Sequence, residues 1–133
     1  MIVADTNLLV YLYIRRDHSE HAEAAASRDP VWAAPLLWRS EFRNALVSML
    51  RRGAVEMHDA LRTIGEAEQW MRGREYTVSS DLVLRLAASS RCSAHDCEFV
   101  ALAQDLGVSL VTPDREVLVS FPDAAVSLAD FVR

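Results

Sequence analysis

Two acidic residues follow apolar runs in a way that could place both carboxylates at one edge of a sheet. Asp5 comes directly after Ile2-Val3-Ala4, and Asp114 comes two residues after the apolar run 108–112. If both runs are strands of one parallel sheet, their carboxyl ends lie at the edge where α/β proteins bind ligands. The two acids, far apart in sequence, would then be near in space.

Two further acids stand beside apolar helix faces. Glu41 lies about 80° from the centre of the apolar stripe of a helix predicted over 35–52, counting about 100° per residue. Asp96 lies in the first turn of a helix whose later residues, 99–103, are strongly apolar. Each also has a purely structural explanation. Glu41 could reach water from the edge of its helix, and Asp96 has capping-box spacing from Ser93.

Structural roles exist for the other two acids as well. A turn or helix cap would account for Asp5, and a first-turn acid favoured by the helix dipole would account for Asp114. Taken together, the four acids are better explained by convergence on a cation, because four packed carboxylates would otherwise repel one another. Ligand sets made only of oxygen suit Mg²⁺ or Mn²⁺. Two such ions about 3.5–4 Å apart can stabilise the attacking water and the leaving oxygen in phosphodiester cleavage.

The four histidines give weaker signals, and the metal chemistry above requires none of them. His18 and His21, three residues apart in an early helix, are predicted to face solvent, and His58 stands at a helix start. His95 adjoins Asp96 and is a candidate to modulate that carboxylate.

Composition excludes several enzyme classes. All basic residues are arginine, so the chain cannot supply the lysine of a P-loop or of a pyridoxal Schiff base. The net charge of −5 argues against a protein that coats nucleic acid. A nuclease remains possible, since bound cations reverse the local charge of a carboxylate cluster. Cys92 and Cys97 are too few and too close for a disulfide framework and are expected to be reduced.

The length of 133 residues, with no linker or repeat, predicts a single domain over 1–133. No apolar stretch approaches the roughly 20 residues of a membrane span. No basic leader precedes the first strand, so the cytoplasm is the expected location.

Short apolar runs alternate with helical patterns throughout. Strands are expected at 2–4, 31–34, 76–78, 108–112 and 125–128, and helices at 8–14, 18–27, 35–52, 57–71, 81–89, 94–106 and 114–120. Each crossover is long enough for a right-handed βαβ unit. The pattern therefore predicts the α/β class, with helices on both faces of a mostly parallel sheet of four to five strands.

Local signals set the expected ends of these elements. Asn7 is a candidate cap for the first helix, and Asp17 and Glu20 have the spacing of a capping box. Pro35 suits the first turn of the long helix, and Gly53 is expected to end it.

Four motifs, in this order, resemble those of the PIN-domain ribonucleases. They are Asp5-Thr6-Asn7, Ser40-Glu41-Phe42, the run 95–103 (HDCEFVALA) and Leu110-Val111-Thr112-Pro113-Asp114. Their order and spacing, and the chain length, are similar to those of the bacterial VapC toxins of type II toxin–antitoxin pairs. The likeness extends to the ending 126–131. It implies a PIN-like three-layer α/β/α sandwich.

The resemblance also implies roles for particular residues. The acidic quartet that binds Mg²⁺ or Mn²⁺ and activates water for RNA cleavage would be Asp5, Glu41, Asp96 and Asp114. Supporting polar positions, which orient such acids by hydrogen bonds, fall on Thr6, Asn7 and Thr112. The family further implies a homodimer, and a VapB-like antitoxin whose C-terminal segment lies across the active site.

Other charged residues near these motifs have less certain roles. Arg15, Arg16 and Arg115 are the candidates for phosphate contacts. Glu98 and Glu116 are additional acids that could support the quartet.

The predicted helical hairpin offers a possible protein interface. Arg39 and Arg43 lie on the opposite edge of the long helix from Glu41, which favours a solvated face or an interface. The hairpin also carries apolar residues offered as a dimer or antitoxin surface, namely Leu46, Leu50, Val55, Leu61, Ile64 and Trp70.

Three readings remain open from the sequence. The first is a metal-dependent ribonuclease acting as a VapC-like toxin. The second is a catalytically silent PIN-type module that binds protein or RNA without cutting. The third is a structure-specific DNA nuclease of the same chemistry, although the chain lacks the extra helical clamp that such enzymes add.

Overall fold

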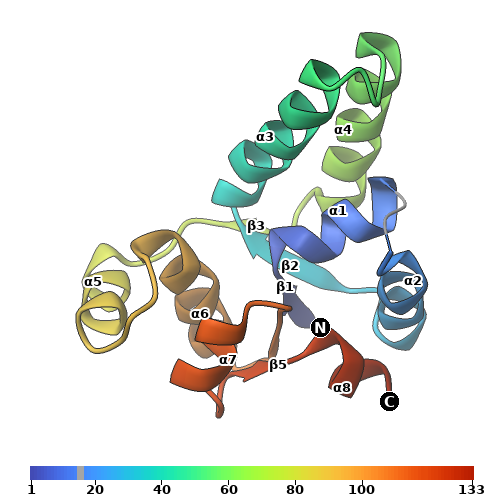
Figure 1. Cartoon of the computed structure of the whole chain (residues 1–133). Coiled ribbons are helices and arrows are strands. Elements are labelled where there is room, and N and C mark those ends of the chain that lie inside the picture. Colours follow the sequence, from blue (N-terminus) through green and yellow to red (C-terminus); the bar gives the residue numbers. More distant parts are fainter. Residues whose placement is uncertain (15–16) are drawn as a thin grey trace.

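The computed structural model describes residues 1–14 and 17–133, with a five-stranded sheet at its centre (Figure 1). The strands are β1 (Ile2–Ala4), β2 (Trp32–Pro35), β3 (Glu75–Tyr76), β4 (Leu110–Val111) and β5 (Ala125–Val126). Neighbouring strands all pair in parallel, in the order β3-β2-β1-β4-β5. The expected α/β class and the parallel sheet are confirmed.

Helices cover both faces of this sheet. They are α1 (Thr6–Ile14), α2 (Ser19–Arg28), α3 (Leu37–Arg51), α4 (Met57–Met71), α5 (Ser80–Ala88), α6 (Ala94–Leu106), α7 (Arg115–Ser120) and α8 (Leu128–Val132). Helix α6 packs on β1, β2 and β4, and α5 packs on α6, whereas α1, α3 and α4 contact the strands from the other side. This arrangement is the expected three-layer sandwich.

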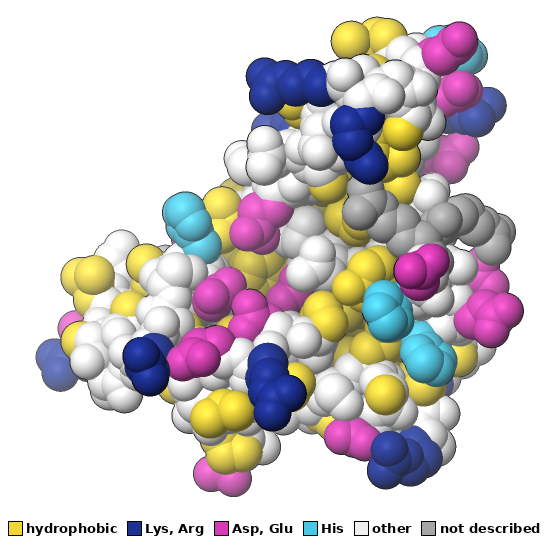
Figure 2. All heavy atoms as spheres, viewed as in Figure 1, with side chains coloured by type: hydrophobic (Ala, Val, Ile, Leu, Met, Phe, Trp, Pro, Cys, Tyr) yellow, Lys and Arg dark blue, Asp and Glu magenta, His cyan; other side chains and the backbone are white. Residues whose placement is uncertain are grey.

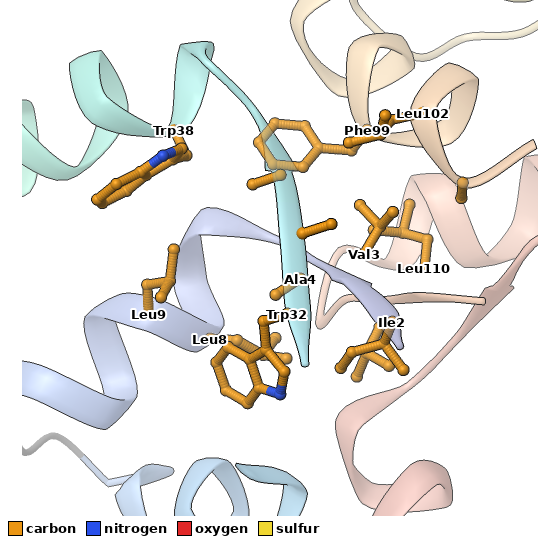
Figure 3. Packing of buried hydrophobic residues seen from close by; sticks show 14 of the residues in the cluster. Ile2, Val3, Ala4, Leu8, Leu9, Trp32, Trp38, Phe99, Leu102 and Leu110 are labelled. Carbon is orange, nitrogen blue, oxygen red and sulfur yellow. The ribbon is translucent and has the colours of Figure 1, made fainter. Parts of the chain in front are cut away.

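The apolar strand runs are explained by burial on two faces. Val3 and Leu110 point toward Leu102 of α6, while Trp32 lies on the side of Leu8 from α1 (Figure 3). Every residue of β1 is buried. Strands of a parallel sheet covered on both faces lose the alternation of polar and apolar residues, so the run before Asp5 is wholly hydrophobic.

Helices α3 and α4 form a hairpin that projects away from the sheet (Figure 1). The chain itself covers part of its predicted docking surface. Five of its apolar residues pack into or against the core, namely Leu46, Leu50, Val55, Ile64 and Trp70. Only Leu61 of the proposed set is well exposed, at 63%. Leu46 is buried and the other four are partly exposed, so the core leaves only part of this surface open, and its use as a dimer or antitoxin surface stays a prediction.

Arg39 ties α3 to α4 and β3. Its guanidinium donates to both carboxylate oxygens of Glu75, at 2.6 and 2.8 Å, and to Glu68 at 2.8 Å. The indole of Trp38 also donates to Glu75, at 2.7 Å. Arg43 is more exposed and approaches Glu68 only to 3.8 Å. The expectation of a solvated or interface role is thus corrected for Arg39, whose charge is used within the chain.

Two of the predicted helix starts are wrong. Helix α1 begins at Thr6, and the residue before it is Asp5, not Asn7. Helix α2 begins after His18, which makes no side-chain cap bond, so the expected capping box from Asp17 does not form. The His18 ring instead lies 4.9 Å from the ring of Tyr11, a tertiary contact that the local pattern does not contain.

Two further boundaries differ from expectation. Pro35 is the last residue of β2, not part of the long helix. The final predicted strand is shorter, because Ser127 accepts a hydrogen bond from the N–H of Asp130 and starts α8. Cys92 and Cys97 are buried free thiols, as expected. Among the helices of the described residues, none has the length and apolar character needed to cross a bilayer.

Candidate active site

The carboxyl ends of β1 and β4 bring Asp5 and Asp114 to one place. Pairing of Ala4 with Val111 sets the two strand ends side by side, and the Asp5 N–H donates to the Val111 carbonyl at 3.1 Å. The Thr112 hydroxyl then donates to Oδ2 of Asp5 at 2.7 Å, and accepts from the Asp114 N–H at 3.0 Å. One buried hydroxyl therefore links the two strand-end acids.

Asp5 and Asp114 also cap the helices that follow them. Oδ1 of Asp5 accepts from the Asn7 N–H at 2.9 Å, at the start of α1. Oδ1 of Asp114 accepts from the Val117 N–H at 3.1 Å, at the start of α7. The capping explanation is thus confirmed for Asp5, while Asp114 caps α7 and does not lie in its first turn as expected. Each cap bond holds its carboxylate in a fixed orientation at the edge of the sheet.

Glu41 is linked to the same edge through α1. The Thr6 hydroxyl donates to Oε1 of Glu41 at 2.7 Å, although the two residues are 35 apart in sequence. Thr6 directly follows Asp5, so the residue that binds Glu41 of α3 is next in sequence to the acid at the end of β1. Glu41 is half-buried on α3, and its carboxylate accepts from Thr6.

Asp96 comes from the opposite layer, in the first turn of α6. The Ser93 hydroxyl caps this helix by accepting from the Asp96 N–H at 3.1 Å. Asp96 is half-buried, and its charge raises the pKa of both Asp5 and Glu41. Asp96 therefore acts on Asp5 and Glu41 through its charge.

Electrostatics distinguish Asp5 from an ordinary surface acid. Burial raises its pKa most, the hydrogen bonds from Thr112 and Asn7 lower it, and repulsion from Asp96 and Asp114 raises it again. The pKa of Glu41 is raised, first by burial and further by Asp5 and Asp96. Figure 2 shows acidic side chains gathered in the hollow between α3, α6 and α7 on one face of the molecule. Negative charge at this place is costly without a cation.

The donor set fits a hard divalent cation. The four side chains offer only carboxylate oxygens, the ligands that Mg²⁺ and Mn²⁺ prefer. Within residues 1–14 and 17–133, however, no three His, Cys, Asp or Glu side chains are already close enough to hold an ion. Carboxylates repel one another unless a cation lies between them, so a separation too wide for three of them to contact one ion is expected of the carboxylates alone.

The remaining candidates have mixed positions. Asn7 supports Asp5 through its backbone N–H, and its side chain is exposed. Arg115 is exposed at the start of α7, directly after Asp114. Arg15 and Arg16 lie outside the described residues.

The additional acids do not join the quartet. Glu98 lines a separate pocket with Tyr76 beside β3 and α5. Glu116 is exposed, with its carboxylate 4.0 Å from Arg91. Sequence reasoning named Thr6 and Thr112 as supports but did not say which acid each would hold. That partner choice depends on the pairing of β1 with β4 and on the packing of α1 against α3.

A family model for the PIN domain matches residues 2–124. Ribonuclease VapC3 of Pyrobaculum aerophilum is 27% identical over 124 residues, covering 91% of this chain and 95% of the relative.

Solved structures share the fold. The PAE2754 protein of Pyrobaculum aerophilum superposes with a TM-score of 0.77 and 23% identity, over 98% of this chain and 85% of the other. A toxin–antitoxin complex from Klebsiella pneumoniae gives a TM-score of 0.72 at 20% identity, over 96% and 98% of the two chains.

Proposed function

Because this chain belongs to the PIN-domain family, we propose that it is a Mg²⁺- or Mn²⁺-dependent ribonuclease that acts as a VapC-like toxin. The observation that carries the proposal is the linked set of acids. Thr112 holds Asp5 beside Asp114, and Thr6 holds Glu41 beside the same strand end. The relative named ribonuclease VapC3 supports RNA as the substrate.

The four carboxylates of Asp5, Glu41, Asp96 and Asp114 would hold the cation. When bound, a divalent ion lowers the pKa of a coordinated water and stabilises negative charge on the phosphate being cleaved. The raised pKa values of Asp5 and Glu41 support this role, because the free energy that opposes their ionisation is relieved when a positive charge is bound.

The supporting hydroxyls orient these oxygens. Thr112 donates to one oxygen of Asp5 while the Asn7 N–H occupies the other, so the carboxylate cannot rotate freely. Thr6 restricts Glu41 in the same way. Each carboxylate oxygen has a second lone pair, which remains available to a cation.

Phosphate contacts would come from arginine. Arg115 is exposed beside Asp114 and is suited to bind the RNA backbone. Arg15 and Arg16 remain proposed contacts on sequence grounds alone.

The toxin role rests on the relatives. The structural neighbours include a toxin–antitoxin complex, which supports a VapB-like antitoxin as the partner of this chain. A homodimer and a cytoplasmic location belong to the same proposal.

Cleavage of single-stranded RNA by the purified protein tests the proposal. We expect products only with Mg²⁺ or Mn²⁺, none after EDTA treatment, and none from Asp96→Asn. The matched control is Asp105→Asn, because Asp105 is an exposed acid on the same helix. Undiminished cleavage by folded Asp96→Asn would contradict the proposed site. RNA binding by the wild type without any cleavage would favour the silent binding module.

A further inference from the structure

A small ring-lined pocket lies next to the acidic site. Its walls are Tyr11 from α1, His18 and His21 at the start of α2, Pro113, and the turn into α8 at Leu128. The cavity volume is about 200 Å³. That is smaller than the roughly 300–1,000 Å³ of pockets that hold drug-sized ligands, so it suits a single planar group.

The pocket is connected to the acids through two elements. Pro113 stands between Thr112 and Asp114 in the chain, so one wall directly adjoins the linked pair of acids. Tyr11 lies five residues after the first residue of α1, or roughly 8 Å along the helix axis at 1.5 Å per residue. A nucleotide flanking the cleaved bond can span that distance.

The walls offer flat ring surfaces. The rings of Tyr11 and His18 have centroids 4.9 Å apart, and those of His18 and His21 are stacked with centroids 6.5 Å apart. Figure 2 shows neighbouring histidine side chains bordered by hydrophobic ones, on the same face as the acidic group. Aromatic and histidine rings are the surfaces on which proteins stack unpaired RNA bases.

We infer that this pocket receives one unstacked nucleobase of the RNA, next to the bond that is cleaved. The inference rests on the proposed ribonuclease function and adds a site of substrate selection to it. The base enters between the Pro113 side and the histidine rings, while the acids act on the phosphate. An acidic site repels the RNA backbone, so a base contact beside it supplies attraction that the carboxylates cannot.

Abasic substitution provides the test. The probe is a short fluorescein-labelled single-stranded RNA, cleaved by the wild type at one mapped site, in which each flanking nucleotide in turn lacks its base. We expect one position at which base removal raises KM about tenfold, the size of a typical base-stacking contribution. The double variant His18→Ala/His21→Ala should show a similarly raised KM with intact RNA. Removal of the base at that RNA position should then raise its KM no further.

Matched variants separate ring stacking from other effects. His58→Ala removes an exposed histidine from the start of α4 and should behave as the wild type. His18→Phe/His21→Phe keeps a ring at both positions, so removal of the base at that position should again raise KM. Equal sensitivity to base removal in the wild type and in His18→Ala/His21→Ala would overturn the inference.

Binding measurements distinguish failure of the pocket from failure of the proposed function. Fluorescence anisotropy with Ca²⁺ in place of Mg²⁺ reports binding of the same RNAs without cleavage. One outcome is a wild type that never cleaves RNA and yet binds it more weakly when one base is missing, while the affinity of His18→Ala/His21→Ala is insensitive to that base. In that case the base pocket is supported and the ribonuclease proposal fails. If the alanine variant binds and cleaves RNA normally but escapes antitoxin inhibition, the pocket serves a protein partner and the inference is overturned.

Discussion

Thr112 is the residue on which the local geometry depends most. Its buried hydroxyl donates to Asp5 and accepts from the Asp114 N–H, so it sets the relative position of two acids from different strands. We expect Thr112→Val, which keeps the side-chain shape, to lower cleavage about 10- to 100-fold, the usual effect of losing a hydrogen bond that orients a metal ligand. Initial rates at saturating Mg²⁺ measure this.

Two variants control for the Thr112 result. Thr112→Ser retains the hydroxyl and should recover most of the activity. Thr77→Val changes an exposed threonine outside the acidic site and should have no effect. If Thr112→Val cleaves as fast as the wild type, the orienting role of the hydroxyl is refuted.

Asp5 carries a stability effect whose size depends on pH. Its pKa is raised above the ordinary value, first by burial and further by Asp96 and Asp114. Protonation therefore favours the folded state. This contribution is present below the pKa of the unfolded chain and is lost as the pH rises through the folded-state pKa. We expect Asp5→Asn to be more stable than the wild type at neutral pH without metal, with the difference vanishing in acid.

Urea denaturation in EDTA across the acid-to-neutral range measures the Asp5 effect. Asparagine can still accept the Asn7 N–H, so the helix start is preserved. If the wild type is more stable than Asp5→Asn at neutral pH, the charge of Asp5 does not destabilise the fold and the expectation is contradicted.

At the scale of single elements, the cap of α6 positions Asp96. Ser93 and Ser79 cap neighbouring helices in the same way, accepting from the backbone N–H three residues on. Replacing either by alanine should cost about 1 kcal/mol. Of these two helices, α6 carries a member of the acidic quartet and α5 does not, so Ser93→Ala should also lower cleavage, whereas Ser79→Ala should not. Paired measurements of the urea midpoint and of the cleavage rate compare the two. Equal cleavage rates in Ser93→Ala and Ser79→Ala would show that the cap of α6 does not position Asp96 for cleavage.

The ion pair of Arg39 with Glu75 holds α3, which bears Glu41, against β3. The hydrogen bond from Arg39 is the first cause that lowers the pKa of Glu75. A lowered pKa stabilises the fold above the unfolded-state pKa, and this stability is lost as the pH falls through the folded-state pKa. We expect Glu75→Gln to cost about 2 kcal/mol at neutral pH, since hydrogen bonds to charged groups are worth about 1.5–3 kcal/mol.

Denaturation at neutral and acid pH checks the Glu75 prediction. The variant should lose less stability in acid than the wild type does. Asp81→Asn breaks an exposed pair with Arg85 and should change little. An unchanged acid dependence in Glu75→Gln would show that the pair does not stabilise the fold.

Element order and sheet type were predictable because the strands are short apolar runs separated by helical patterns. The ends of elements were less so. The capping-box spacing at Asp17 does not set the start of α2, which follows His18 without a side-chain cap bond, and Pro35 belongs to β2. Local spacing contains no information about contacts between segments, and for the same reason it does not show how much of the apolar side of the hairpin packs against the core.

At the scale of the whole molecule, the parallel sheet explains how distant acids meet. Asp5 and Asp114 leave adjacent strands at one edge, Glu41 approaches from α3 on one face, and Asp96 approaches from α6 on the other. The approach of these four positions to one edge of the sheet could be expected from sequence, whereas their role as one metal site stays a prediction. The specific pairs Thr112 with Asp5 and Thr6 with Glu41 could not, because they depend on strand register and helix packing.

Direct measurement of metal binding tests the central claim that the four carboxylates form one cation site. Isothermal titration with Mn²⁺ compares the wild type with Asp5→Asn, Glu41→Gln, Asp96→Asn and Asp114→Asn. Amides preserve the helix caps while removing the charge. We expect each variant to weaken binding at least tenfold, and the control Asp105→Asn to bind as the wild type. Unchanged Mn²⁺ affinity in any of the four would remove that residue from the site, and unchanged affinity in all four would contradict the account.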